Sequence, residues 1–399
     1  MANIETHYTY VTDKTITSSG YTTISGAKIA KTNFTNGDRY LLKITAQCRG
    51  FSANGLYGIR PCTDNGVVQA LIAVHSSFVF EPAHGSSFYT FEFVYVWTAN
   101  STQDIILQAK ASTGTHYIEA ITMLAMNLDD SNAGWTKGVE WDWAETDADT
   151  DLTTSWSSTN NASVTLPGAT QSGDYLVLSS GQIDSNSTSS SCESGAAATN
   201  GGTPTADRTI LQEGEDTSEL MYHTVAELLE NVSSNTDRYQ ESRNDSASKG
   251  KRTVSRIFYL YLDALNKHGA IQKTTSTDLG VASFTEHLSL SYTEGSPADY
   301  WIVFGWALSF GDVNDFLYFR LQVDGTSVPE NRDADYGPVL WDADDRLPSS
   351  HCIRTNESLD TSIDIDGKTT NVGTGHDLDE GVIVVFSTEL PTTGIIVTP

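Results

Sequence analysis

A weak internal repeat constrains the fold of this 399-residue chain more than any other feature. Three polar turns each lead into a strand-like run that starts at an aromatic residue, at Tyr40, Tyr175 and Tyr300. An apolar strand-like segment ends 87 to 90 residues after each of them, at Leu128, Leu262 and Leu390. A period of this length is the size of a domain rather than of a solenoid repeat. The chain is therefore predicted to contain three related units.

The runs between the turns are typical of β-strands. Residues 88–97, 257–262 and 301–308 are rich in β-branched and aromatic side chains, and clusters of Gly, Asn, Asp and Ser separate such runs. Helical periodicity is nearly absent. We therefore predict an all-β fold of three tandem β-sandwich domains, each a jelly roll or a Greek key.

The repeat places the domain boundaries after residues 131 and 266. The predicted domains are 1–131, 132–266 and 267–399. A low-complexity Ser/Gly-rich run over 185–203 lies in the middle domain, and its small polar residues predict one long exposed loop.

An arginine supplies a second marker of the repeat. Arg60 and Arg320 each lie 20 residues beyond the marker tyrosine of their unit, in similar sequence contexts. In the middle unit we expect Arg208 to be the counterpart, delayed to 33 residues after Tyr175 by the insertion.

The segment 218–230 fits two structures equally well. Its apolar residues recur at helical spacing, and Ser218 could cap a helix. The corresponding stretch of the first unit, however, is a predicted strand. Both readings stay open on the sequence.

The chain is strongly acidic, with 23 Lys and Arg against 51 Asp and Glu and a formal net charge of −28. The formal net charges of domains 1–131, 132–266 and 267–399 are −2, −12 and −14. Such a surface repels phosphates, so we expect binding neither to nucleic acid nor to an anionic membrane. The near-neutral domain 1–131 is the candidate docking domain, with the two acidic domains facing solvent. Drift in surface composition is the alternative explanation.

The sequence also bears on where the protein is made. The N-terminus has no basic stretch followed by an apolar one, so we expect no signal peptide. No run approaches the ~20 apolar residues of a membrane-spanning helix. The four cysteines form no CxxC pair and are expected to be free buried thiols, as in a protein made in a reducing cytoplasm.

No sequence motif nominates a reaction. Acidic runs such as 147–151 depart from the EF-hand template, and no zinc, P-loop or nucleophile-elbow motif occurs. We therefore expect no enzyme, and no catalytic, cofactor-binding or metal-binding residue.

Tryptophans crowd the start of the middle domain. The cluster consists of Trp135, Trp141, Trp143 and Trp156. It would serve either as packing between the first two domains or as a platform on which sugars stack.

An acidic, cysteine-poor chain of tandem sandwiches without a catalytic motif resembles the accessory proteins of tailed-phage virions, of the capsid-decoration or head-fibre type. The resemblance covers the whole chain but includes no diagnostic motif, so it assigns no residue a role. It implies a structural protein of the virion, made in the host cytoplasm, whose partners are the major capsid protein or other virion proteins. The alternatives are a tail or appendage protein that binds a carbohydrate or receptor, including a host glycan, and a bacterial surface-layer or filament subunit. Self-association is left open.

Overall fold

The computed structural model describes residues 4–50, 56–73, 76, 78–80, 88–100, 102–185, 192–204, 220–244, 250–265, 268–273, 275, 277–278, 283–292, 300–309, 317–328, 346–355, 362–369 and 377–389. Within these ranges the chain forms β-strands and two short 3-10 turns, Lys31–Asn33 and Leu262–Ala264, which confirms the predicted all-β class. No helix in the described part of the chain is long and apolar enough to cross a membrane.

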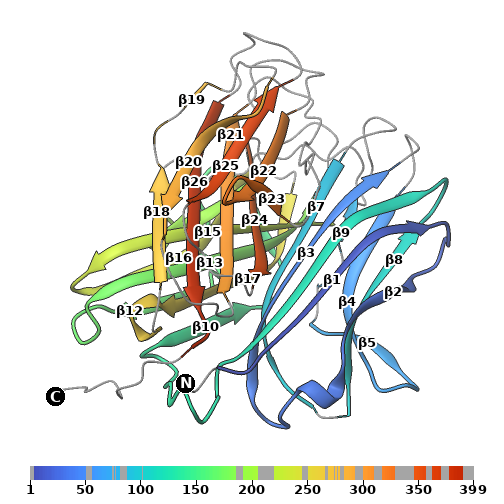
Figure 1. The fold of residues 1–399 in the computed structure, drawn as a ribbon, viewed down its shortest axis with the longest axis horizontal. Coiled ribbons are helices and arrows are strands. Elements are labelled where there is room, and N and C mark those ends of the chain that lie inside the picture. The colour runs from blue at the N-terminus through green and yellow to red at the C-terminus, as the bar shows by residue number, and fades with distance from the viewer. Residues whose placement is uncertain are drawn as a thin grey trace.

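The first unit is a sandwich of two sheets (Figure 1, blue to cyan). One sheet has the strand order β1-β9-β3-β7, and the other contains β2, β8 and β4 with the short strands β5 and β6 beside β4. Its strands are β1 (Thr6–Ile16), β2 (Thr22–Ile29), β3 (Arg39–Gly50), β4 (Tyr57–Asp64), β5 (Gln69–Leu71), β6 (Phe78–Phe80), β7 (Phe88–Thr98), β8 (Asp104–Ala111) and β9 (His116–Asn127).

The second unit repeats this arrangement (Figure 1, green to yellow). Its larger sheet has the order β10-β17-β13-β15, with β11 also paired to β17, and its smaller sheet has the order β12-β16-β14. One residue pair between β15 and β6 joins the larger sheet to the first unit. The strands are β10 (Trp141–Thr146), β11 (Thr150–Asp151), β12 (Ser163–Pro167), β13 (Gly173–Ser185), β14 (Cys192–Ala197), β15 (Leu220–Val232), β16 (Asn235–Asn244) and β17 (Gly250–Tyr261).

The third unit has two sheets as well (Figure 1, orange to red). Their orders are β18-β26-β21-β24, with β19 paired to β26, and β20-β25-β22-β23. The strands are β18 (His268–Lys273), β19 (Thr277–Asp278), β20 (Thr285–Ser291), β21 (Tyr300–Ser309), β22 (Leu317–Val323), β23 (Thr326–Val328), β24 (Arg346–Thr355), β25 (Ser362–Thr369) and β26 (Asp377–Ser387).

The three units share one topology. In each unit, the first strand pairs with the last strand. The last strand also pairs with the strand that begins at or near the marker tyrosine. That strand in turn pairs with an edge strand, which is β7, β15 or β24. We call these three four-stranded sheets, β1-β9-β3-β7, β10-β17-β13-β15 and β18-β26-β21-β24, the inner sheets. Within the described residues of the third unit, the eight strands other than β19 pair in the orders 1-8-3-6 and 2-7-4-5, which is a jelly roll. The predicted three-fold repeat of β-sandwiches is thus present in the fold.

The strand positions contradict the insertion that was predicted for the middle unit. The strands β4, β14 and β22 occupy the same place in their units, and each begins 17 residues after its marker tyrosine, at Tyr57, Cys192 and Leu317. The counterpart of β4 is therefore β14 and not the segment around Arg208, which lies outside the described residues. The edge strands β7, β15 and β24 begin 48, 45 and 46 residues after their marker tyrosines, so the middle unit has no insertion between its marker tyrosine and its edge strand.

The prediction of one exposed loop over 185–203 is wrong for residues 192–197, which form β14. Four of its side chains are buried, although they are small or polar: Glu193, Ser194, Ala196 and Ala197. Small residues fit there because the sheets lie close together: a Cβ added at Gly181 would lie 3.0 Å from Nε2 of Gln240. Composition alone suggested a loop because it does not show this tight packing.

The segment that fitted both helix and strand is a strand. Leu220–Val232 forms β15 and pairs with β13 over most of its length, with Leu228 opposite Leu176. Pairing with a long partner strand therefore outweighs the local helical spacing.

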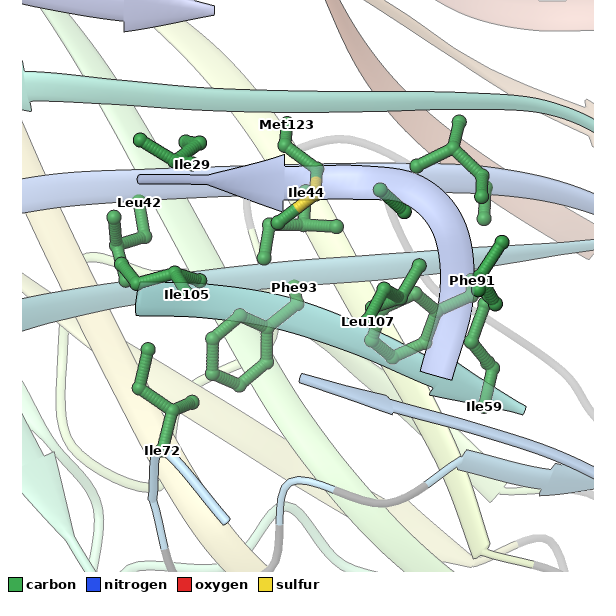
Figure 2. Close-up of a cluster of buried hydrophobic side chains, with 14 of the residues drawn as sticks. Ile29, Leu42, Ile44, Ile59, Ile72, Phe91, Phe93, Ile105, Leu107 and Met123 are labelled. Atoms are coloured by element: carbon green, nitrogen blue, oxygen red, sulfur yellow. The ribbon is translucent and has the colours of Figure 1, made fainter. Parts of the chain in front are cut away.

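The first unit has an apolar interior of its own (Figure 2). Leu42 and Ile44 of β3 face Ile105 and Leu107 of β8 across the two sheets, and the aromatic ring of Phe93 fills the space beside them. The interior also contains the free thiol of Cys48, and burial raises its pKa above the ordinary value. The thiol of Cys62 is also free and buried, as predicted.

Candidate functional site: the junction of the three units

The inner sheets are buried on both faces. On β3, β13 and β21, the marker tyrosine is fully buried in its own unit, and the next residue points to the opposite face. Those next residues are Leu41, Leu176 and Trp301, and all three belong to a single apolar cluster shared by the three units. We call this cluster the junction.

The last strand of each unit contributes to the junction in the same way. Leu124 and Met126 of β9, Phe258 and Leu260 of β17, and Val384 and Phe386 of β26 are at most 1% exposed and belong to it. The three edge strands β7, β15 and β24 also contact one another pairwise. Equivalent strands from all three units therefore surround one apolar centre, so a single chain has the arrangement of a trimer.

Hydrogen bonds tie the units together around this centre. The backbone N–H of Ile4 donates to the carbonyl oxygen of Thr388 at 2.8 Å, joining the first unit to the third. The backbone N–H of Leu228 donates to Oε1 of Gln272 at 3.0 Å, joining the second to the third. Because contacts link the third unit to both of the others, the three sandwiches do not form an open string.

A buried arginine joins the first and second units. Nε of Arg256 lies 2.6 Å from Oε2 of Glu145, and the Arg256 side chain is 0% exposed. Its guanidinium lies 5.4 Å from the ring centre of Phe93 and 5.2 Å from that of Tyr95, both on β7. A charge that is paired, and held against aromatic rings, can stay buried at this boundary. Arg256 was not predicted from the sequence, although a charge directly before the apolar run 257–262 was a signal.

The structure brings together three of the four predicted tryptophans. Trp141 is fully buried in the junction, Trp135 is 9% exposed beside it, and the ring of Trp143 packs edge-on against Tyr95 of the first unit with centroids 5.6 Å apart. The guanidinium of Arg39 lies 4.6 Å from the centre of the Trp141 ring. A fully buried ring cannot stack on a sugar, so Trp141 is not available to the glycan-binding alternative.

Trp156 lies apart from the other three. Its partly exposed ring lies under the guanidinium of Arg243, 4.8 Å from its centroid, and Arg243 pairs with Glu193 at 2.6 Å. The four tryptophans therefore do not form one platform.

The middle unit has a polar region beside its apolar interior. Nε2 of Gln240 donates to Oγ of Ser194 at 2.6 Å and to Oγ of Ser242 at 3.1 Å. Arg252 is fully buried and donates to the carbonyl oxygen of Thr159 at 2.7 Å. These hydrogen bonds satisfy many of the polar groups buried in the interior of the sandwich. Without partners, such groups would be costly to remove from water.

Glu241 lies next to Gln240 and is 0% exposed. Oε1 accepts a hydrogen bond from the backbone N–H of Gly201 at 2.9 Å. Burial is the largest influence on this carboxyl group and raises its pKa to about 7, although the hydrogen bond from Gly201 opposes the shift. The group therefore takes up a proton close to neutral pH.

We expect Glu241→Gln to stabilise the protein above pH 7. Because the carboxyl pKa is higher in the folded chain than its ordinary value, the folded state binds more protons between about pH 4.5 and pH 7, and stability falls as pH rises through that window. A neutral amide removes this loss, a gain of roughly 1–3 kcal/mol at pH 8, and can still accept from Gly201. Urea unfolding from pH 4 to pH 8 measures it.

The matched control is Glu230→Gln, which changes an exposed carboxylate on β15. It should leave the slope of stability against pH as in the wild type. An equal slope in wild type and Glu241→Gln would show that Glu241 does not titrate in this window.

Metal binding has no support in the described residues, where no group of three or more His, Cys, Asp or Glu side chains is placed to hold an ion.

No family model matches the chain, and no curated protein matches it. Among solved structures, it is similar to a protein of an archaeal virus described by its triple jelly roll fold and turret assembly, with 10% identity, 93% of this chain and 83% of that chain covered, and a TM-score of 0.20. It is also similar to PNGF-II, with 9% identity, 79% of each chain covered and a TM-score of 0.30. A third is the major capsid protein P2 of bacteriophage PM2, with 12% identity, 62% of this chain and 97% of that chain covered, and a TM-score of 0.22. All three TM-scores lie below 0.5, so the fold assignment stands on the strand order of the chain itself.

Proposed function

We propose that this protein is a non-enzymatic structural component of a virion, a capsid decoration protein held on the particle surface by protein–protein contacts. The observation that carries the proposal is the junction, which makes three jelly rolls one block with the symmetry of a trimer. Jelly rolls are a recurrent architecture of virus shells. A chain of this kind fits a three-fold or quasi-three-fold position of a shell as a single molecule.

The junction also sets the expected oligomeric state. In this chain the edge strands β7, β15 and β24 are in contact within one molecule, so they are not free to recruit two further copies. Native mass spectrometry should therefore show the released protein as a single chain of 43.3 kDa.

The acidic surface supports the same role. Domains 132–266 and 267–399 carry most of the charge of −28, which keeps a particle surface soluble and keeps the protein away from the packaged genome. The role needs no catalytic group and no cofactor.

The test is attachment to particles. Virions are purified by density gradient, the protein is released by mild denaturant, and the recombinant chain is then offered to the stripped particles. We expect it to co-sediment with them again. A protein that is absent from purified virions, and that fails to bind stripped ones, would contradict the proposal.

The glycan-binding alternative rests on the two partly exposed tryptophans, Trp143 and Trp156. Binding to a glycan array that is lost in Trp156→Ala would favour this alternative over attachment to a shell.

A further inference from the structure

The exposed large apolar side chains of the described residues are confined to one hairpin. Val67, Val68 and Leu71 are 89%, 59% and 39% exposed, and all three lie in the turn and return strand of the hairpin β4–β5. We call residues 64–71 the finger. It extends from the edge of the first unit, away from the other two (Figure 1, β5). Single apolar residues are common on surfaces, but three on one projecting hairpin form a patch.

The finger is held in one conformation by its own polar groups. Oδ1 of Asn65 accepts from the backbone N–H of Val67 at 2.9 Å and of Val68 at 2.7 Å, and Oδ1 of Asp64 accepts from that of Gly66 at 2.7 Å. Gly66 has φ +83°, which a side chain would strain. The valines are therefore displayed by an ordered turn, which lowers the entropy lost when a partner binds them.

The base of the finger is fixed by side chains of its own sheet, on β2 and β8. Nε2 of Gln69 donates to Oδ2 of Asp64 at 3.0 Å and to Oγ1 of Thr23 at 3.3 Å, and Oε1 of Gln69 accepts from Gln108 at 2.5 Å. Both carboxylate oxygens of Asp64 are thus engaged, and no other charged residue lies in the finger.

The third unit shows what this hairpin looks like without the valines. The equivalent hairpin β22–β23 closes through two residues, Asp324 and Gly325, between the paired residues Val323 and Thr326. In the finger, four residues separate the paired Asp64 and Gln69. The two units keep the same hairpin, so the apolar tip is a departure from the repeat.

The shape and the apolar surface of the tip limit the kind of partner that can bind it. A convex apolar tip is buried well only by a concave apolar surface, and a second copy presents no exposed large apolar side chain in its described surface except another convex finger. The finger carries one carboxylate, Asp64, and the other two units repel an acidic particle, so a neutral or basic rim around the pocket suits the contact.

We propose that the finger is the docking element of the protein, and that it inserts Val67 and Val68 into an apolar pocket on a neutral or basic surface of the virion shell. This inference rests on the proposed function and names the residues by which the protein would contact the shell.

The decisive variant deletes Val67 and Val68. It leaves Asp64-Asn65-Gly66-Gln69, in which Asn-Gly forms the favoured two-residue turn, so the hairpin closes as β22–β23 does and the net charge is unchanged. Stripped particles are incubated with the wild type or the variant and sedimented, and the bound fraction is measured over a concentration series. We expect the variant to bind at least about tenfold more weakly, because it lacks the two valines whose burial in the pocket would stabilise the complex.

Two further variants keep the test independent of folding. Val67→Thr with Val68→Thr keeps the shape of the tip without its apolar surface and should bind as weakly as the deletion, whereas Val67→Ile with Val68→Ile should bind like the wild type. Thermal unfolding should show the wild-type Tm for all of them, because the tip is outside every core.

The outcomes separate the two proposals. Equal binding by wild type and deletion overturns the docking role of the finger and leaves the virion role intact. Failure of the wild type itself to bind particles overturns both. Concentration-dependent dimers that vanish in the deletion would assign the finger to a second copy instead, against the proposal.

Discussion

Phe258→Ala is expected to lower the free energy of unfolding of the whole chain by about 3–5 kcal/mol, the range for truncating a buried phenylalanine. Phe258 is 0% exposed and belongs to the junction, the apolar cluster to which all three units contribute side chains. A cavity there weakens three interfaces together. Urea unfolding followed by circular dichroism gives the size of the loss, and hydrogen exchange shows where protection falls.

The loss of protection from hydrogen exchange should extend over all three units. Peptides from β3, β17 and β21 should lose protection in parallel, because the three inner sheets share one core. Val67→Ala, at the exposed tip, is the control and should change nothing. Loss confined to β17, with wild-type protection in β3 and β21, would show that the units fold independently.

Arg256→Ala is expected to cost about 2–4 kcal/mol. The substitution removes a fully buried guanidinium from Glu145 and from the rings of Phe93 and Tyr95, and leaves a gap between the first and second units. The lower half of the range reflects the side chain of Glu145, which is 26% exposed and can be hydrated once its partner is gone. Chemical unfolding measures the loss.

The matched control is Arg256→Lys, which keeps the charge but not the planar group that lies against the rings, and should recover part of the loss. A double-mutant cycle with Glu145→Ala isolates the ion pair, whose coupling energy should exceed about 0.5 kcal/mol. Additive single losses would show that Arg256 acts through packing alone.

The junction also decides how the docking role of the first unit can be tested. Deleting residues 1–131 would be the direct experiment if the three domains were independent of one another. That deletion removes Leu41, Leu124 and Met126 from the junction, however, and exposes the apolar face of the other two inner sheets. The finger variants leave the junction whole and are therefore the cleaner test.

Strand content and the repeat could be predicted because they depend on local pattern. Tyr40, Tyr175 and Tyr300 lead runs of β-forming residues, and in the structure each is a buried residue in or beside the same strand of its unit. The position of β14 could not be predicted, because its Ser, Gly and Ala residues resemble a loop until the opposing sheet is in place.

The junction was missed although its signal was in the sequence. The runs that begin at Tyr40 and Tyr175 continue with leucine or valine in successive positions rather than alternating with polar residues. Such runs are typical of strands buried on both faces, and a sandwich in water buries only one. The sequence thus indicated that something covers the second face, but only the structure identifies it as the other two units.

The pairing of first and last strands affects how the chain folds. β1 pairs with β9, with Thr6 opposite Met126, and the same closure recurs in the other two units. Contacts so distant in sequence form slowly, because a long loop must close before they stabilise anything. On the ribosome, β1 cannot pair with β9 until about a hundred further residues have emerged, and Ile4 reaches Thr388 only after 384 more residues have been made. The apolar faces that the third unit covers therefore stay exposed until that unit has been made, and the yield of native protein depends on how fast it follows.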